Sequence, residues 1–268
     1  MKVSAQWALG LVCVLALLSA ACGGGEDKAA AGMDAQLAPL QEQQGALEAK
    51  RAELADLKAQ IAAAATAEPA EEDATGEEGE AAPTVEELTA QAEAMQGEIN
   101  GMSDDFMTAV VTFINSVELY EGEPIPDAIQ KAINMKSAED MVYAGEYIWE
   151  GGEYRRAIEI LDTALLLDPN NAELQAARDK AASDQFMIEE RFAAVSKGMT
   201  QAEVRTAIGT VSRHNLREYP DKNVVAWFYR REDRGAAGVW FEEKDGAMRV
   251  YKSDFNAIEA PEEEGEGQ

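Results

Sequence analysis

The side chains that most often perform nucleophilic or acid–base chemistry are scarce in this sequence. His214 is the single histidine, and Cys13 and Cys22 are the two cysteines. Nucleophile–base pairs of the Ser–His or Cys–His kind therefore have almost no material. Acidic clusters at 71–73 and 262–264 lie in stretches whose composition predicts disorder, where two carboxylates are not held at a defined separation for catalysis. We expect a protein that is not an enzyme and that has no catalytic residue and no metal.

Cys22 is the residue with the clearest predicted chemistry. Lys2 gives a basic start, residues 8–18 form an apolar run that is too short to span a bilayer, and small residues lead to the cysteine. This stretch resembles the lipobox of bacterial lipoproteins, although Ser19 stands where that pattern usually has leucine. The resemblance implies that residues 1–21 are a signal peptide and that a covalent lipid on Cys22 is the only attached group, with no other cofactor. An ordinary signal peptide cut before an incidental cysteine is the alternative.

The residues after Cys22 bear on its location. Removal of the signal peptide leaves Cys22 as the only cysteine, so no internal disulfide is expected. Gly23, and not aspartate, follows the cysteine, which by the same resemblance implies an outer-membrane lipoprotein facing the periplasm, in the cell envelope. The glycine-rich composition predicts a flexible tether over 22–32. We therefore expect a membrane partner that is reached through the lipid anchor.

The charge is large and unevenly distributed. The net formal charge is −28, and it becomes −29 when Lys2 is removed with the signal peptide. Residues 22–183 contain 10 basic and 34 acidic residues, whereas residues 184–254 contain 12 of each. Clustered positive charge is what phosphate binding requires, so nucleic acid is excluded as an expected partner. The asymmetry predicts at least two separately built regions.

The residues that follow the tether predict a helical hairpin. Leucine and isoleucine recur at heptad-compatible spacing over 33–64, but the alternate seam positions are polar, so we predict a helix that does not form a tight coiled coil by itself. Thr84 and Glu87 form a capping box, and a more apolar seam follows over 84–102. This second helix is expected to pack against the first, with 65–83 as an acidic disordered loop. The polar seam positions are Gln44, Arg51 and Lys58.

The hairpin has two possible roles, a spacer and an arm that docks a partner or a second copy of the chain. The polar seam favours the spacer.

Residues 138–171 carry a second resemblance. Small residues, an aromatic residue and turn residues occur at the spacing of a tetratricopeptide repeat, whose period is about 34 residues. We expect Gly145, Ala157 and Ala164 to let two antiparallel helices approach closely, and Gly152 to make the turn between them. One repeat cannot bury its own faces, so helices 103–120, 125–135 and 172–183 are expected to complete a helical region over 103–183. The resemblance implies a groove for a protein partner, with a purely structural helical pair as the alternative.

The candidate partner-binding tyrosines of the helical region are Tyr143, Tyr147 and Tyr154.

Residues 184–254 predict a small α+β domain. A helix over 184–196 precedes Lys197-Gly198-Met199-Thr200, Thr200 and Glu203 form a capping box, and Gly209 ends a short helix. Aromatic and β-branched stretches then predict a three- to four-stranded antiparallel meander. Two helices with this motif and meander resemble the SmpA/OmlA family, the BamE-like lipoproteins of outer-membrane protein assembly, although the proline that usually follows the glycine is missing here. Residues 255–268 are expected to form an acidic tail.

Taken together, these features predict an α+β protein that acts as an envelope scaffold binding other proteins, with outer-membrane assembly components implied as partners. The alternative is an inhibitor or regulator of an envelope enzyme that uses the meander. Arginines of this domain are candidate contacts for an acidic partner or for anionic lipid, unless they pair locally with Glu218, Asp221, Glu232 and Asp233. These candidates are Arg213, Arg217, Arg230 and Arg231, with Arg234 beside them.

Overall fold

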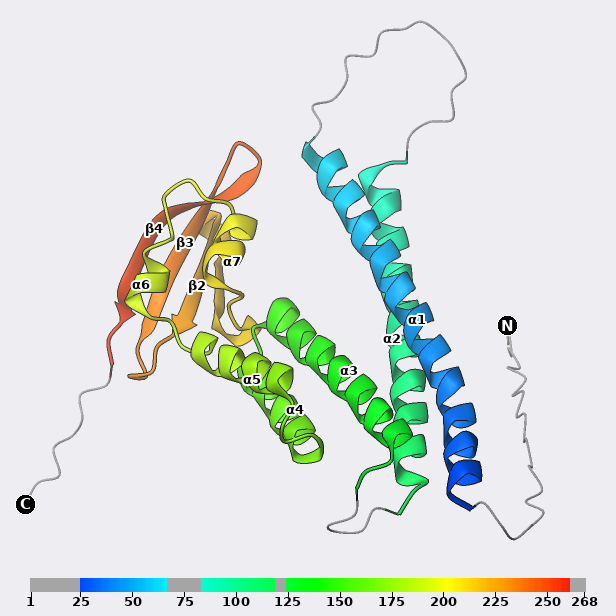
Figure 1. Cartoon of the computed structure of the whole chain (residues 1–268). Coiled ribbons are helices and arrows are strands. Elements are labelled where there is room, and N and C mark those ends of the chain that lie inside the picture. The colour runs from blue at the N-terminus through cyan, green and yellow to red at the C-terminus, as the bar shows by residue number, and fades with distance from the viewer. Residues whose placement is uncertain (1–24, 67–82, 119–123, 261–268) are drawn as a thin grey trace, which may run out of the picture.

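The computed structural model describes residues 25–66, 83–118 and 124–260, with helices first and an antiparallel sheet last (Figure 1). The expected α+β class is confirmed. Cys22, the predicted signal peptide and most of the acidic loop 65–83 lie outside the described residues. Among the described helices, none combines the length and apolar character that crossing a membrane requires. The helices are α1 (Gly25–Thr66), α2 (Val85–Asn115), α3 (Asp127–Gly151), α4 (Tyr154–Leu167), α5 (Ala172–Asp184), α6 (Glu189–Phe192) and α7 (Gln201–Ile208).

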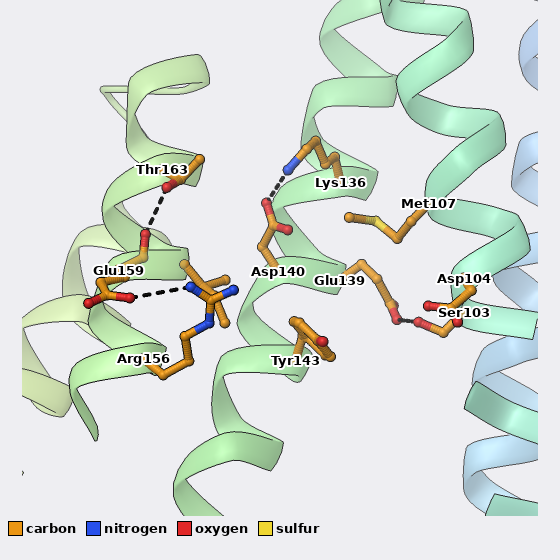
Figure 2. Close-up of a pocket in the computed structure, with 11 residues that line it drawn as sticks. Ser103, Asp104, Met107, Lys136, Glu139, Asp140, Tyr143, Arg156, Glu159 and Thr163 are labelled. Carbon is orange, nitrogen blue, oxygen red and sulfur yellow. Dashed lines mark hydrogen bonds and ion pairs between the residues drawn. The ribbon is translucent and has the colours of Figure 1, made fainter. Parts of the chain in front are cut away.

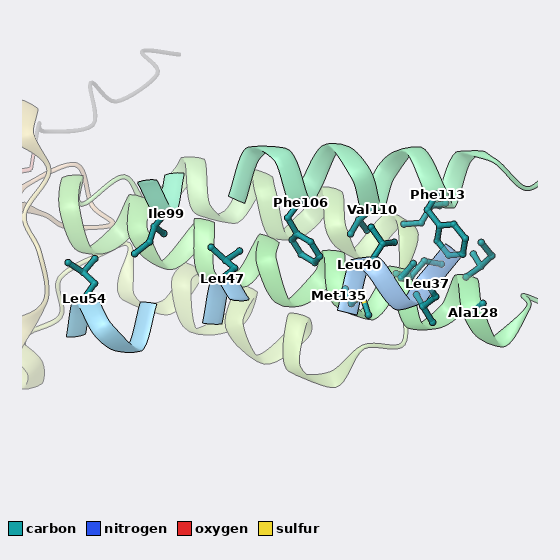
Figure 3. Packing of buried hydrophobic residues seen from close by; sticks show 14 of the residues in the cluster. Leu37, Leu40, Leu47, Leu54, Ile99, Phe106, Val110, Phe113, Ala128 and Met135 are labelled. Atoms are coloured by element: carbon teal, nitrogen blue, oxygen red, sulfur yellow. The ribbon is translucent and has the colours of Figure 1, made fainter. Parts of the chain in front are cut away.

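α1 and α2 form the predicted hairpin, and the first half of α3 packs against both helices (Figure 3). The two apolar seams meet in the core, where Leu47, Ile99 and Phe106 are at most 2% exposed. Removing a leucine side chain from water stabilises a fold by roughly 1.5–3 kcal/mol, so this continuous stripe holds the three helices together. The α3 residues in the same core are Ala128, Ile129, Ala132, Ile133 and Met135.

The polar seam of α1 has a structural explanation. Arg51 donates two hydrogen bonds to the Glu139 carboxylate of α3, at 2.8 and 2.6 Å. Ser103 of α2 donates a hydrogen bond to the same carboxylate. Lys58 donates to Gln96 of α2 at 3.3 Å. Arg51 and Lys58, two polar residues of the seam, therefore form hydrogen bonds with neighbouring helices. The partner of Arg51 lies on α3, a third helix that the heptad pattern did not predict.

Three predicted boundaries differ from the structure. α1 begins at Gly25, so residues 25–32 of the predicted tether are helical. α2 runs without a break through the predicted boundary between 84–102 and 103–183, because the three–four spacing of its buried residues continues. α3 likewise joins the predicted helix 125–135 to the first helix of the repeat. The helical hairpin and the repeat region therefore share two continuous helices.

α3, α4 and α5 form the helical pairs predicted around 138–171. Gly152 ends α3 in the left-handed region, with φ 61°, and its N–H donates to the Ile148 carbonyl at 2.9 Å. Ala157 and Ala164 are buried at close contacts between helices, as predicted. The prediction that Gly145 lies at a close helix contact is wrong, because this glycine is exposed and a Cβ there would have no neighbour within 4 Å.

The C-terminal region is a four-stranded antiparallel meander of order β1-β2-β3-β4, with α6 and α7 over one face (Figure 1). Thr200 and Glu203 form the predicted capping box, and Gly209 ends α7 as predicted. The predicted helix 184–196 is wrong, because only the single turn of α6 forms there after α5. β4 also extends into the predicted tail 255–268. The strands are β1 (Leu216–Tyr219), β2 (Val224–Arg230), β3 (Ala236–Lys244) and β4 (Ala247–Ile258), with 3₁₀ turns at Arg213–Asn215 and Pro220–Lys222.

The sheet region is joined closely to the end of α3. A Cβ on Gly152 would lie 2.6 Å from backbone atoms of Val211 and Ser212. Thr210 also donates a hydrogen bond to the Trp149 carbonyl at 3.0 Å. The joint between the two regions therefore requires the main chain at the end of α3 to lie close to the main chain of residues 210–212.

Candidate functional site

A hollow of about 370 Å³ lies between α2, α3 and α4, and we call it the first hollow (Figure 2). α2 contributes Ser103, Asp104 and Met107. α3 and α4 contribute Lys136, Glu139, Asp140, Tyr143, Arg156, Glu159, Ile160 and Thr163. The lining combines apolar side chains with charges of both signs.

The acidic side chains at the floor of the first hollow have partners. Burial alone would raise the pKa of Glu139, but hydrogen bonds from Arg51 and Ser103 outweigh it and hold that pKa below its usual value. For Asp140 burial prevails over the hydrogen bond from Lys136, at 2.6 Å, and raises the pKa. The Glu139 carboxylate thus joins α1, α2 and α3, whereas Asp140 pairs within α3.

A second hollow of about 430 Å³ continues from the first along α3. Asp104 and Tyr143 line both, so the two form one surface, which we call the helical groove. The groove follows α3 from Lys136 to Gly151, which is about 22 Å at ~1.5 Å per helical residue. That length accommodates several residues of a partner chain. The second hollow is lined by Gln96, Asn100, Asp104, Tyr143, Glu146, Tyr147, Glu150, Gly151, Glu153 and Arg213.

The second hollow of the helical groove is lined by more acidic than basic side chains, although Arg51 and Lys58 partly offset the charge of Glu146. Among the described residues, no cation forms an ion pair within 4 Å of Asp104, Glu146 or Glu150. Burial is the main cause of a raised pKa at Glu146. Arg213 is the only basic residue in the lining of this hollow. The groove therefore attracts basic groups, because opposite charges on two facing surfaces favour association.

Two tyrosines form an apolar platform at the centre of the groove. The rings of Tyr143 and Tyr147 are packed edge to face with centroids 5.0 Å apart, and their hydroxyl groups are 3.3 Å apart. Tyr143 is 47% exposed, so its ring remains accessible. Aromatic side chains that combine an apolar ring with a solvent-exposed polar group are common anchors in protein interfaces.

The structure brings three of the predicted partner-binding residues together and separates the rest. Tyr143, Tyr147 and Arg213 line the helical groove. Tyr154 does not, because it lies at the joint between the regions, and a Cβ on Gly209 would come within 2.8 Å of its hydroxyl group. Burial raises the pKa of Tyr154.

The remaining predicted arginines lie on the sheet region. Arg231 forms an ion pair with Asp233, as the local-pairing alternative required. Arg217 and Arg230 line a different hollow, and among the described residues neither forms an ion pair. Local pairing therefore accounts for Arg231 but not for these two arginines.

Sequence reasoning missed the contribution of α2 to the groove. Asp104 was not singled out, although Asp104 and Asp105 interrupt the apolar pattern just before Phe106. Two adjacent carboxylates directly before the apolar C-terminal part of α2 are the available signal. Their neighbours on α3 and α4 are remote in sequence, so the groove itself required the structure.

In the part of the chain that the structure describes, no three His, Cys, Asp or Glu side chains are grouped closely enough to hold a metal ion. Comparison of the chain with protein-family models, with curated proteins and with solved structures gives no match.

Proposed function

We propose that this protein is a lipoprotein of the cell envelope, anchored through a lipid on Cys22, which binds a basic segment of another protein in its helical groove. The observation that supports the proposal is the set of unpaired carboxylates beside the exposed ring of Tyr143. The cavity offers shape and charge for recognition, whereas the acidic groups at its floor already have partners. The role that we propose is therefore that of a scaffold.

The partner segment is expected to combine basic and apolar residues. Asp104, Glu146 and Glu150 favour Lys or Arg side chains, and charge complementarity mainly increases the association rate and the selectivity. Met107 and Ile160 offer apolar contacts next to Tyr143. An amphipathic helix or an extended chain that fills a groove in this way is a common mode of peptide recognition.

The cellular role follows from the two sequence resemblances. A lipid on Cys22 would keep the protein at the outer membrane, and a BamE-like C-terminal region is consistent with a role in outer-membrane protein assembly. We include this role in the proposal, with components of that assembly as the expected partners.

Crosslinking the protein in its membrane, followed by identification of the attached proteins, tests the groove. Asp104→Lys reverses a charge inside the groove, so capture of the partner is expected to fall at least about tenfold, a difference of ~1.4 kcal/mol. Asp105→Lys is the matched control, because Asp105 is exposed on the same helix and lines neither hollow. Equal loss in both variants would count against the groove. Capture of a single soluble hydrolase would favour an inhibitor.

Mass spectrometry of the mature N-terminus tests the anchor. A diacyl or triacyl group on Cys22 is the expected result, and Cys22→Ser is expected to release the protein from the membrane. A free thiol at Cys22 would contradict this part of the proposal and leave the test of the groove unaffected.

A further inference from the structure

The face of the sheet that points away from α6 and α7 carries aromatic and basic side chains. Phe228 of β2 and Trp240 of β3 are packed edge to face, with centroids 5.7 Å apart. Lys252 of β4 places its Nζ 4.4 Å from the centroid of the Trp240 ring. Arg217 and Arg230 lie on the neighbouring strands β1 and β2. Glu242 and Asp254 share this open face by register, and Asp254 lies 3.9 Å from Lys252. The basic side chains of the face without an ion pair among the described residues therefore include Arg217 and Arg230, in a protein whose net charge is −28.

A hollow of about 400 Å³ lies at one end of the open face, and we call it the arginine hollow. Arg217, Arg230 and Arg234 line it, and among the described residues no acidic side chain does. Its other lining residues are Asn215, Tyr219, Phe228, Gly235, Ala236 and Ile258. Arginine side chains that line one hollow without an acidic neighbour favour the binding of carboxylates.

The contacts of these arginines leave them without a counter-charge among the described residues. Arg217 donates hydrogen bonds to the carbonyls of His214 and Leu216, at 3.0 and 2.8 Å. The Arg230 guanidinium lies 5.2 Å from the centroid of the Phe186 ring. In the part of the chain that the structure describes, neither of these arginines nor Arg234 forms an ion pair.

The end of β4 brings an acidic segment of the same chain to this place. Ile258 lines the arginine hollow and is paired with Ala236 of β3. Residues 261–268, outside the described residues, begin three positions after Ile258 and contain four glutamates and no basic residue. At ~3.3 Å per extended residue, a segment of this length reaches about 26 Å. It is therefore long enough to cross the hollow from its attachment point.

We propose that residues 261–268 bind in the arginine hollow, with glutamates of the segment paired to Arg217, Arg230 and Arg234. Attachment through β4 keeps the local concentration of the segment high, so weak contacts suffice. Exposed ion pairs are individually weak and are screened by salt, so binding is reversible. The segment thereby occupies the open face, and any acidic ligand for this face must displace it.

Arginine side-chain NMR on the full ¹⁵N-arginine-labelled chain in detergent tests the proposal. Neutralising the segment with E262Q/E263Q/E264Q/E266Q is expected to shift the Nε–H resonances of Arg217, Arg230 and Arg234. The matched control E71Q/E72Q/E77Q/E78Q removes the same number of charges elsewhere and is expected to leave these resonances in place. Unchanged resonances in the first variant, or equal shifts in both variants, would overturn the proposal.

A second measurement supplies the segment separately. In a chain that ends at Ala260, the three resonances are expected to take the positions seen in the neutralised variant. Adding the peptide PEEEGEGQ is expected to move them back, and salt near 1 M, where the screening length is about 3 Å, is expected to abolish this effect. A peptide with glutamine in place of glutamate is the control. A response to phosphatidylglycerol vesicles but not to the acidic peptide would overturn the proposal in favour of a lipid surface.

Discussion

The helical region and the sheet region present unpaired charges of opposite sign. The helical groove has Asp104, Glu146 and Glu150 without ion pairs among the described residues, and the arginine hollow has Arg217 and Arg230 in the same condition. Residues 184–254 contain equal numbers of acidic and basic residues, yet three arginines line one hollow of the sheet region and no acidic side chain among the described residues joins them. The net charge of a sequence segment therefore does not predict the local charge of its surfaces, because the fold determines which side chains share a face.

The two regions also differ in the composition of their cores. The helical region buries the ion pair of Arg51 and Glu139, whose side chains are 22% and 7% exposed. The core of the sheet region is built from apolar residues, with Tyr229 as a polar exception whose hydroxyl group donates to the Gly209 carbonyl at 3.1 Å. Changes in polar groups are therefore expected to affect the helical region more strongly.

The largest effect is expected from Glu139→Ala. Removing one partner of a buried pair leaves the other charge without compensation, which costs about 3–5 kcal/mol. We expect a loss near the lower end of this range, because Arg51 keeps partial exposure. Urea unfolding followed by circular dichroism for the helices, and by the fluorescence of Trp227 in a chain with Trp7, Trp149 and Trp240 replaced by phenylalanine, measures the change in each region. Equal destabilisation of both regions would break the comparison.

A double variant separates the loss of the pair from the loss of packing. R51M/E139L replaces both charges by apolar side chains, and such a replacement is commonly neutral or stabilising. It is expected to recover most of the stability that Glu139→Ala loses. Asp162→Asn, which breaks an exposed ion pair with Arg178, is the control and is expected to cost at most about 1 kcal/mol.

The next prediction compares Gly152, which caps the C-terminus of α3, with Gly145 inside the same helix. Gly152→Ala places a Cβ in a left-handed backbone and against the backbone of Val211 and Ser212, so we expect a cost of about 2–4 kcal/mol and a loosened joint. Gly145→Ala is expected to stabilise by about 0.5–1 kcal/mol, because the site is helical, exposed and open. Thermal unfolding measures both. A neutral Gly152→Ala would show that the joint tolerates rearrangement.

Local signals predicted much of the fold because they depend on residues close in sequence. Both capping boxes, at Thr84 and Thr200, form as expected, and so do the turn at Gly152 and the end of α7 at Gly209. The predicted helix boundary near 102 is wrong. The apolar stripe of α2 continues past this position, so one helix runs through it. The contact of Arg51 with Glu139 was also missed, since it joins helices 88 positions apart.

The candidate site was predictable in its parts and not in its arrangement. Tyr143 and Tyr147 are among the predicted partner-binding residues of the helical region, and their rings pack against each other in the structure. Arg213 reaches the same groove only because the sheet region is joined to the end of α3. Such a contact depends on tertiary packing, and no periodicity within either region encodes it.

A smaller effect is expected from pH, with opposite signs at two neighbouring carboxylates. The pKa of Glu139 lies below its ordinary value of 4.5 in the folded protein, so its contribution to stability is present above that pH and is lost as pH falls through the lowered pKa. The pKa of Asp140 lies above its ordinary 3.8, so protonation at acidic pH favours the folded state. Thermal unfolding below about pH 4.5 is expected to show a shallower loss in Glu139→Gln and a steeper loss in Asp140→Asn. The same slope in both variants would contradict these pKa directions.

The smallest effects are expected from the two N-caps, and they compare the regions most directly. Thr84 begins α2 and Thr200 begins α7, and in each case the threonine hydroxyl accepts a hydrogen bond from the N–H of the glutamate three residues later, at 3.2 and 3.3 Å. Replacing such a threonine by alanine costs about 1 kcal/mol.

The two substitutions are expected to differ in how far their effect spreads. α7 has only eight residues and its buried stripe contacts the sheet core, so we expect Thr200→Ala to lower the stability of its region. Thr84→Ala is expected to have a smaller effect, because it frays one end of a helix of 31 residues. Hydrogen exchange resolves the two cases: Thr84→Ala should increase exchange only in the first turn of α2, whereas Thr200→Ala should increase it through α7. Exchange that spreads along all of α2 would show that the helical hairpin depends on its cap as strongly as the sheet region does.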